Sequence, residues 1–366
     1  MAKHIKKEEN LEINKVQSKL TYKKVRLYFY LTILTFFLSF LSIYIIYKII
    51  GDTNVNFYSL FKLNIIIPCL ICLVCYFFFD GIRFYYILRS LDVRVSKKLL
   101  AKVVFLNMFV SNITPSAVGG GFIQIFYLKK GGVNIGDATA ATVIRTVITV
   151  VFFIIFVPIV ILTEKNIRNT SYNIGIIFYT IVILLLYIFV IFFTVYKSKL
   201  FKKIIFLTLR KLKRKKIISR KRFKKINTFF LREISIYAFS MLNFLKTKPY
   251  YTILSVIFSG LFLFSSFTFS VIIIKGLGYD IPITSIIAYQ VMVMFLMYFA
   301  PTPGSTGIAE GAYSFLFSGL IRSSDIVIVT AAWRFFTIYI GVIMGLIIFY
   351  FDIAKGFFNS NKDATL

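Results

Sequence analysis

The sequence Pro301-Thr302-Pro303-Gly304-Ser305-Thr306-Gly307-Ile308-Ala309-Glu310 interrupts a long apolar segment that runs from Ile286 to about Leu320. Each apolar piece beside this interruption has about fifteen residues or fewer, whereas a helix needs about 20 residues to cross a bilayer. Irregular backbone at membrane depth is tolerated only where it is buried in protein or lines a wet cavity. The segment 286–320 therefore predicts a broken helical hairpin that dips into a membrane.

A second interruption of the same kind lies in the segment 99–128. It reads Asn112-Ile113-Thr114-Pro115-Ser116-Ala117-Val118-Gly119-Gly120-Gly121, and lysines stand just before and just after the segment, at Lys97, Lys98, Lys129 and Lys130. Because basic residues gather on the cytoplasmic side of a membrane, the segment is expected to begin and end on that side. It predicts a second re-entrant hairpin.

The rest of the chain predicts ordinary membrane-spanning helices. The sequence has 366 residues, of which 58% are hydrophobic, and its mean hydropathy is +0.83. Its apolar runs are continuous, while the strands of a membrane barrel would alternate apolar and polar residues. The expected fold is therefore an all-α, polytopic integral membrane protein with about six full spans and two broken re-entrant hairpins in an inverted repeat. The spans are expected at about 27–47, 63–88, 138–162, 174–196, 251–274 and 326–350.

The basic residues predict the orientation and the division of the chain. Residues 1–26 form a basic tail, 27–196 a first membrane half, 197–248 a basic linker, 249–350 a second membrane half and 351–366 a second tail. By the positive-inside rule both tails and the linker are cytoplasmic, in a bacterial plasma membrane. Apolar residues from Phe223 to Leu245 recur at helical spacing and predict an amphipathic helix at the membrane interface.

The two interruptions match one another. Thr114-Pro115-Ser116-Ala117-Val118-Gly119 aligns with Thr302-Pro303-Gly304-Ser305-Thr306-Gly307, and each interruption is followed by an aspartate that is expected to cap the next span, Asp137 and Asp325. An arginine then follows inside each span. Counting spans gives the two units opposite orientations, and inverted repeats with paired broken helices indicate the central site of a transporter.

Charged residues inside the predicted spans are the candidates for that site. A charge near the bilayer centre costs about 2.5 to 3.5 kcal/mol, so it needs a partner and usually has a purpose. Arginine suits a phosphate, because its planar fork presents donors to the phosphate oxygens. The candidate substrate-binding residues are Arg145, Arg334, Glu310, Thr114, Pro115, Gly119, Thr302, Pro303, Gly304 and Gly307. The alternative is that the charged members form structural ion pairs, and this alternative is favoured for Asp80 and Arg83, which can reach the interface.

Other functions find little support. The formal charge of +30 is spread over the segments between spans and forms no nucleic-acid-binding module. Cys69, Cys72 and Cys75 lack a fourth metal ligand, and the single histidine, His4, is in the tail. No metal, no cofactor and no catalytic residue is therefore expected. Trp333 could stack on a ligand, but packing is the favoured role.

The run Pro301-Thr302-Pro303-Gly304 with Gly307 and Glu310 resembles the signature of the lysylphosphatidylglycerol synthase transmembrane region, also called the flippase-like domain family. Asn112, Pro115, Gly119–Gly121 and Arg145 resemble the motif of its first half, and the likeness extends from Leu63 to Tyr350. The sequence departs from the family pattern at one position, where Ser305 replaces a glycine.

The resemblance implies a membrane domain that handles lipid. In the complete synthases this region is linked to moving the modified lipid between leaflets, and aminoacyl transfer is carried out by a separate soluble domain, which is not expected in this chain. The expected function is a lipid flippase or transporter for an anionic or phosphate-bearing lipid. A lipid-modifying enzyme or its accessory subunit, and a small-solute transporter, remain alternatives. The expected partners are membrane lipids, with a second copy of the chain or a separate lipid-modifying enzyme as further candidates and no nucleic acid.

Overall fold

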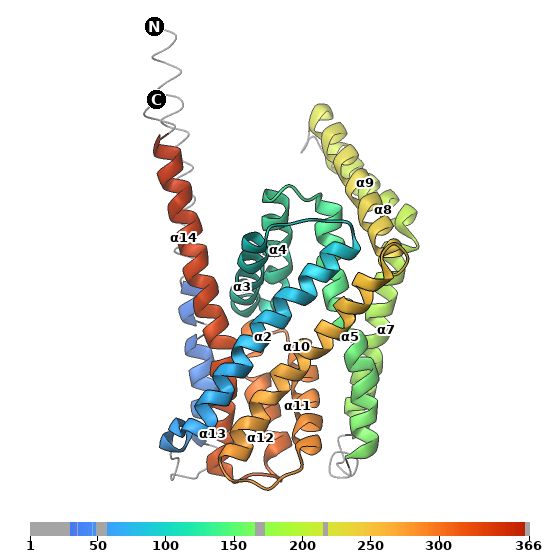
Figure 1. The fold of residues 1–366 in the computed structure, drawn as a ribbon. Coiled ribbons are helices and arrows are strands. Elements are labelled where there is room, and N and C mark those ends of the chain that lie inside the picture. The colour runs from blue at the N-terminus through green and yellow to red at the C-terminus, as the bar shows by residue number, and fades with distance from the viewer. Residues whose placement is uncertain are drawn as a thin grey trace.

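The computed structural model describes residues 30–34, 36–45, 47–48, 57–164, 173–214 and 219–362. Within these ranges the chain forms helices and no strand, which confirms the all-α membrane fold (Figure 1). The predicted tail 1–26 lies outside the described residues. The elements are η1 (Phe57–Phe61), α2 (Leu63–Ser90), α3 (Lys97–Ile113), η2 (Pro115–Ala117), α4 (Val118–Lys130), α5 (Ile135–Thr163), α7 (Asn173–Val195), α8 (Ser198–Arg214), α9 (Arg220–Asn243), α10 (Pro249–Gly276), α11 (Ile283–Tyr298), η3 (Pro303–Ser305), α12 (Ile308–Phe317), α13 (Ser323–Arg334), η4 (Phe335–Tyr339) and α14 (Ile340–Lys362).

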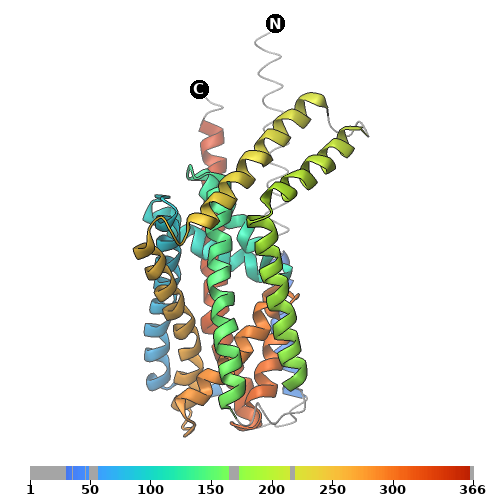
Figure 2. The ribbon, with the colours of Figure 1, turned by 90° about the vertical axis from the view of Figure 1, so that its right-hand side faces the viewer.

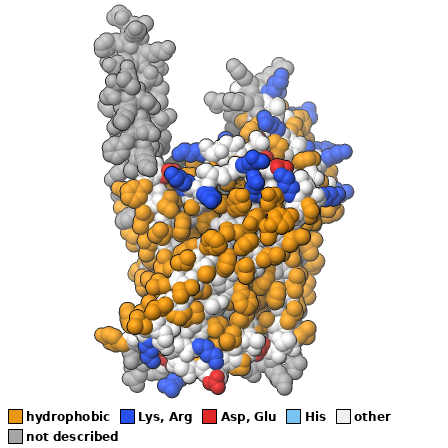
Figure 3. Space-filling view, viewed as in Figure 1, with side chains coloured by type: hydrophobic (Ala, Val, Ile, Leu, Met, Phe, Trp, Pro, Cys, Tyr) orange, Lys and Arg blue, Asp and Glu red, His pale blue; other side chains and the backbone are white. Residues whose placement is uncertain are grey.

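Four helices among the described residues are long and apolar enough to cross a membrane. They are Leu63–Ser90, Ile135–Thr163, Pro249–Gly276 and the continuous segment Ser323–Asp352, and they coincide with four of the six expected spans. A fifth expected span falls on α7. The first falls on the apolar helix Tyr30–Ile45, which includes an undescribed position. Figure 3 shows a band of hydrophobic side chains across the middle of the molecule, with Lys and Arg gathered mainly at one end.

The two interrupted segments fold into helical hairpins that enter the bundle from opposite ends. The pair α3 and α4 lies toward the end at which α9 and the C-terminal end of α14 are found, and the pair α11 and α12 lies toward the other end (Figure 1). Their tips meet, since η2 contacts η3. This arrangement agrees with the inverted repeat that the sequence predicts.

The backbone at the two tips is nearly the same. Ser116 has φ 53° and ψ 22°, and Gly304 has φ 58° and ψ 19°. The residue after each is also left-handed, with φ 55° at Ala117 and 56° at Ser305. A backbone hydrogen bond closes each turn. The N–H of Ala117 donates to the Thr114 carbonyl at 3.2 Å, and the N–H of Ser305 donates to the Thr302 carbonyl at 3.1 Å. The sequence repeat is therefore a repeat of conformation.

The break in the first hairpin is shorter than expected. The interruption was expected to cover Asn112–Gly121, but α3 continues to Ile113 and α4 already begins at Val118. Gly119 and Gly120 lie within α4, and their missing side chains allow α4 to pack closely on α3. A Cβ at Gly119 would lie 2.6 Å from the Thr114 side chain, and one at Gly120 would lie 2.6 Å from Asn107 Oδ1. These glycines bring α4 against α3.

The two aspartates expected as helix caps do not cap. Asn134 and Arg322 occupy the N-cap positions of α5 and α13. Asp137 and Asp325 lie in the first turn, where a carboxylate still opposes the positive end of the helix dipole. Asp137 accepts a hydrogen bond from Ser240 of α9 at 2.6 Å, so its role is to hold α9 onto α5.

The basic linker forms two helices, α8 and α9, which project together from one end of the bundle (Figure 2). Helix α9 was expected to present an apolar face to the membrane interface. Part of that face instead packs on the protein, because Ile234 is buried and Glu233 accepts a hydrogen bond from the backbone N–H of Gly136 at 2.7 Å. The base of this helical pair is therefore anchored to the start of α5.

Candidate functional site

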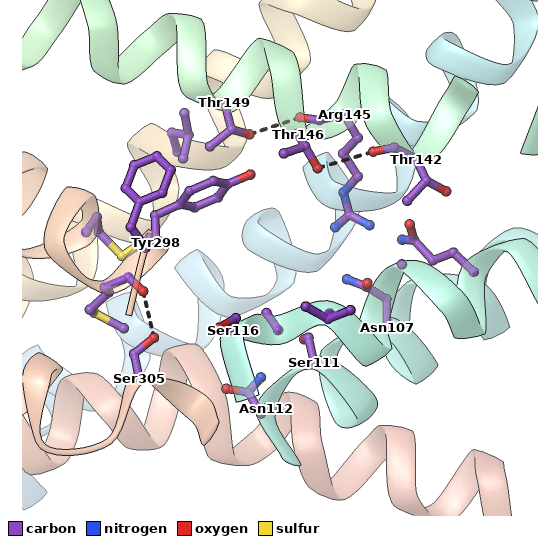
Figure 4. Close-up of a pocket in the computed structure, with 18 of the residues that line it drawn as sticks. Asn107, Ser111, Asn112, Ser116, Thr142, Arg145, Thr146, Thr149, Tyr298 and Ser305 are labelled. Carbon is purple, nitrogen blue, oxygen red and sulfur yellow. Dashed lines mark hydrogen bonds between the residues drawn. The ribbon is translucent and has the colours of Figure 1, made fainter. Parts of the chain in front are cut away.

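A cavity of about 610 Å³ lies where the first hairpin, α5 and the tip of the second hairpin come together. Figure 4 shows Arg145, Thr142, Thr146 and Thr149 on α5 facing Asn107, Ser111 and Asn112 on α3, with Ser116, Tyr298 and Ser305 completing the wall. The further lining residues are Arg83, Ala117, Val118, Gly121, Gln124, Phe153, Phe262, Leu263, Met294, Met297 and Phe299. The site thus combines residues from both halves of the repeat.

Two arginines in this cavity share one carboxylate. The Nη2 atom of Arg145 lies 2.6 and 2.7 Å from the two carboxylate oxygens of Asp80, and Arg83 approaches Oδ1 of the same group with Nε at 2.7 Å and Nη2 at 2.5 Å. All three side chains are buried, with exposed fractions of 0% for Asp80, 4% for Arg83 and 9% for Arg145. Because one carboxylate faces two guanidinium groups, one net positive charge remains beside the cavity.

Packing holds this cluster in place. The Arg83 guanidinium carbon lies 3.6 Å from the centre of the Phe262 ring of α10, and that of Arg145 lies 5.5 Å from the Phe84 ring. Such contacts stabilise a cation against the face of an aromatic ring. The Nη1 atoms of both arginines are buried without a hydrogen-bond partner. Both guanidinium groups are therefore held by the shared carboxylate and by aromatic packing.

The arginine of the second half is closed off. Arg334 pairs with Glu310 at 2.8 Å and donates to the Gly304 carbonyl at 2.9 Å, and both charged side chains are almost fully buried. Ser39 donates to Glu310 at 3.2 Å and is also hydrogen-bonded to Tyr339. The pocket beside Arg334 has only about 10 Å³, which is at the lower limit for one water molecule.

The two halves differ at one decisive position. The alignment of the two tips places Phe122 in the first half where Glu310 stands in the second. Phe122 is 69% exposed and supplies no carboxylate, so the first-half arginine is neutralised only in part, by Asp80 of α2. The open cavity consequently belongs to Arg145, and the structure does not bring Arg334 or Glu310 into it.

The other predicted residues of the first tip shape the turn. The Thr114 hydroxyl donates to the Val110 carbonyl at 2.8 Å and accepts from the N–H of Gly119 at 3.0 Å, so it joins the end of α3 to the start of α4. Pro115 opens the turn. Thr114, Pro115 and Gly119 do not line the cavity. The residues between Pro115 and Gly119 do line it.

The second tip is built in the same way. Thr302 and Pro303 precede the left-handed Gly304, whose carbonyl oxygen accepts from Arg334. Gly307 has φ 84°, a conformation that favours glycine, and its N–H donates to Glu310 at 2.7 Å. Ser305, which replaces a glycine of the family pattern, keeps the left-handed backbone and donates to the Met297 carbonyl at 2.8 Å. These residues fix the tip and the closed ion pair.

Arg83, Asn107 and Gln124 line the cavity and Asp80 pairs with Arg145 beside it, although none of the four was among the candidate substrate-binding residues. Asp80 and Arg83 were expected to form a structural ion pair close to the membrane interface. They do form an ion pair, but the pair is buried and also includes Arg145. The signal was present, since an acid and a base three residues apart share one helix face. Trp333 packs against Tyr313, with ring centres 5.2 Å apart, and does not line the cavity.

The cysteines behave as packing residues. Cys69 and Cys72 are buried, and the Cys72 thiol donates to the Ser265 carbonyl at 3.1 Å. Across the described ranges, no three His, Cys, Asp or Glu side chains gather as a group that could hold a metal ion.

Comparison with known proteins finds a matching family and a related membrane protein. The family model described as lysylphosphatidylglycerol synthase TM region matches residues 57–345. A protein described as a UPF0104 membrane protein, from Archaeoglobus fulgidus, is 22% identical over 272 residues, which cover 74% of this chain and 81% of that protein. No solved structure matches the chain.

Proposed function

This chain belongs to the lysylphosphatidylglycerol synthase transmembrane-region family, and from that premise we propose that it moves an anionic, phosphate-bearing membrane lipid between the two leaflets by alternating access. Membership of the family supports a lipid-related role for a multi-pass membrane protein. The finer proposal is supported by the chemistry of the cavity and by the arrangement of the two hairpins.

The observation that carries the proposal is the buried cluster of Arg83, Asp80 and Arg145 beside the cavity. Charged residues inside membrane segments are costly and usually mark a substrate pathway. Here the cluster keeps a net positive charge beside the cavity, because two guanidinium groups share one carboxylate. A phosphate carries the opposite charge, and its oxygen atoms accept charge-assisted hydrogen bonds from guanidinium groups.

The cavity is also open at its edge. Val118 lines it and is 56% exposed, and the neighbouring Phe122 is 69% exposed. Both are large apolar side chains on the outer part of α4. A headgroup held at Arg145 could therefore leave its acyl chains outside the protein, against these apolar residues. This geometry suits a lipid better than a water-soluble substrate.

The inverted hairpins supply a route for alternating access. In the described state Arg145 faces an open cavity and Arg334 is closed by Glu310. Because the two halves are related by inversion, an exchange of these two arrangements would open the opposite side of the site. Under this proposal the Glu310–Arg334 pair belongs to the closed half and is not the headgroup site.

The proposed location is a bacterial plasma membrane with both termini on the cytoplasmic side. The end of the molecule that carries α8, α9 and the C-terminal end of α14 also carries most of the basic side chains visible in Figure 3. Basic residues are concentrated on the cytoplasmic side of membrane proteins, and they are attracted by anionic headgroups there.

The experiment is leaflet translocation of a labelled anionic phospholipid in proteoliposomes. The wild-type protein is expected to accelerate movement over protein-free vesicles, and Arg145→Gln is expected to slow it by about tenfold or more, because charge-assisted hydrogen bonds to the phosphate are lost. Lys275→Gln is the control, since Lys275 is paired with Asp280 outside the cavity. Equal rates for wild type and Arg145→Gln, or no acceleration by the wild type, would contradict the proposal.

A further inference from the structure

Helix α8 carries a high positive charge and an exposed apolar stripe. Its 17 residues include seven basic residues and no acidic one. Leu200, Ile204 and Leu207 are 48%, 50% and 42% exposed, and their spacing places them on one face of the helix. Exposed basic residues border this stripe, namely Lys203, Arg210, Lys211 and Arg214. An apolar stripe beside many cations is typical of a helix that lies on an anionic membrane surface.

Helix α8 packs on α9 through a different face. The Phe206 ring lies 6.0 Å from the Phe223 ring of α9, measured between ring centres, and Lys202 donates to the Ser235 hydroxyl of α9 at 2.8 Å. Lys202 and Phe206 each stand two positions from Ile204, and residues two apart on a helix do not face the same way. The apolar stripe therefore points away from α9.

The membrane surface is within reach of the stripe. Helix α7, which coincides with an expected span, ends at Val195, and α8 begins at Ser198. Tyr196 between them is 67% exposed, and Lys197 is also exposed. Tyrosine and basic residues are enriched where a span leaves the lipid. Figure 2 shows α8 leaving the end of α7 at an angle to the bundle, so the stripe begins close to the level of the headgroups.

The other helix of the pair, α9, is bonded to the first turn of α5. Glu233 accepts a hydrogen bond from the Gly136 N–H at 2.7 Å, and Ser240 donates to Asp137 at 2.6 Å. A Cβ at Gly136 would lie 2.6 Å from Cβ of Ile236, so the two helices touch closely at this point. A movement of the α8–α9 pair would therefore act on the start of α5.

We propose that α8 docks through its apolar stripe on anionic lipid headgroups of the leaflet at this end of the molecule, and that α9 transmits the docking to α5 and the cavity. Arg145 stands about 12 Å along α5 from Asp137, at the helical rise per residue, and a helix can carry a displacement as a rigid element. Anionic lipid is then an effector that acts from the membrane surface. The docking does not depend on the proposed translocation.

A fluorophore on the stripe tests the docking. Leu207→Cys, in a background in which the partly exposed Cys75 is replaced by alanine, carries an environment-sensitive label, and the protein is reconstituted in vesicles of phosphatidylcholine with or without phosphatidylglycerol. The emission is expected to shift to the blue, and to be quenched by a lipid-borne quencher, only when phosphatidylglycerol is present. Emission alike in the two compositions would overturn the docking, whether the label stays in water because an acidic protein is the true partner or enters both membranes regardless of charge.

Removal of the bordering charges tests the chemistry of the contact. Each basic residue near an anionic surface strengthens binding by roughly fivefold, so the ratio of docked to undocked label should fall at least about tenfold when Gln replaces Lys203, Arg210, Lys211 and Arg214. The control replaces by Gln four exposed cations around the start of α3 and the end of α9, namely Arg94, Lys97, Lys98 and Lys246, and should leave the ratio unchanged. An equal loss in both variants would show that net charge alone is responsible, and would overturn the assignment to α8.

The accessibility of the cavity tests the transmission without measuring transport. Thr142 lines the cavity on α5, and Thr142→Cys, again with Cys75→Ala, can be modified by a small thiol reagent. The rate of modification is expected to change at least about threefold when phosphatidylglycerol is added, which is within the range of such couplings. The α8 variant without its four bordering charges should lose this change. If it keeps the change, the lipid acts on the cavity directly, and the transmission is overturned.

The double variant Glu233→Ala with Ser240→Ala cuts the bonds between α9 and α5. It is expected to keep the lipid-dependent emission shift of the label on α8, which shows that the helical pair is folded and docked, and to lose the lipid dependence of modification at Thr142→Cys. A dependence that persists would overturn the transmission and leave the docking standing. Neither readout measures translocation, so a failure of the proposed function is distinguishable from a failure of this inference.

Discussion

Arg145 and Asp80 lie 65 positions apart in the sequence, yet one guanidinium nitrogen of Arg145 bonds both carboxylate oxygens of Asp80, at 2.6 and 2.7 Å. This contact joins α5 to α2 inside the bundle. Because Arg83 uses the same carboxylate, the cluster is a stable packing element and a source of positive charge at once. The cavity depends on both properties.

Loss of the shared carboxylate is expected to destabilise the fold. Asp80→Asn would leave two buried guanidinium groups without a counter-charge, at a cost of about 3–5 kcal/mol. The thermal unfolding midpoint of the purified protein in detergent should fall clearly. Asp92→Asn removes the exposed pair with Lys248 and should change stability by at most about 1 kcal/mol. Similar midpoints for the two variants would show that the cluster is not a buried ion group.

Much of the fold could be predicted from the sequence because lipid imposes simple rules. Span length, the distribution of lysines and the matched Thr-Pro turns gave the helices and the opposed hairpins. The helix starts were less predictable. Asn and Asp are equally favoured at an N-cap, so the local sequence does not decide between Asp137 and Asn134, which occupies that position.

The site was predictable only in part. Arg145 stood out because a buried charge is costly, and the pairing of Arg334 with Glu310 follows from their chemistry. Asp80 and Arg83 could equally have reached the interface, and only the packing of α2 against α5 and α10 decides between the two positions. The difference between the two halves was also not predicted. It becomes clear when Phe122, which is exposed, is compared with Glu310, which occupies the matching position and is buried.

The glycine run of α4 is expected to tolerate no side chain at position 120. A Cβ at Gly120 would lie 2.6 Å from Asn107 Oδ1 and 2.7 Å from Ser111 Cβ, so Gly120→Ala must push α4 away from α3, at a cost of about 1–3 kcal/mol. Gly260→Ala in α10 meets nothing within 4 Å and should be neutral or stabilising by up to about 1 kcal/mol. Unfolding midpoints that do not separate these two variants would be inconsistent with the tight α3–α4 contact.

The closed ion pair of the second half is expected to act on stability. Glu310→Gln removes the counter-charge of Arg334, which is 1% exposed, and should lower stability by about 3–5 kcal/mol. The double variant Glu310→Gln with Arg334→Met removes both charges and should recover part of the loss, as measured by the unfolding midpoint. Asp280→Asn, which breaks an exposed pair with Lys275, is the control. A double variant less stable than the single one would argue against this pairing.

The conformation of the second tip gives a separate prediction. Gly307 has φ 84° with open space around its missing side chain, so Gly307→Ala is strained by its backbone and not by contacts, at a cost of about 1–2 kcal/mol. Gly311→Ala in the following helix also meets nothing within 4 Å and should not be destabilising. The two unfolding midpoints, compared in one detergent, measure the strain at the tip directly.

The most direct test of the central claim, that a lipid headgroup passes through the Arg145 cavity, is reversible blockage of that cavity. Ser116 lines it at the tip of the first hairpin, and Ser116→Cys can carry a bulky disulfide-linked adduct, in a background in which the partly exposed Cys75 is replaced by alanine. Ser318→Cys, at the exposed end of α12, is the matched control. The account predicts that the adduct at position 116 stops translocation of labelled phosphatidylglycerol, that reduction restores it, and that the adduct at position 318 has no effect. Undiminished translocation with position 116 fully modified would contradict it.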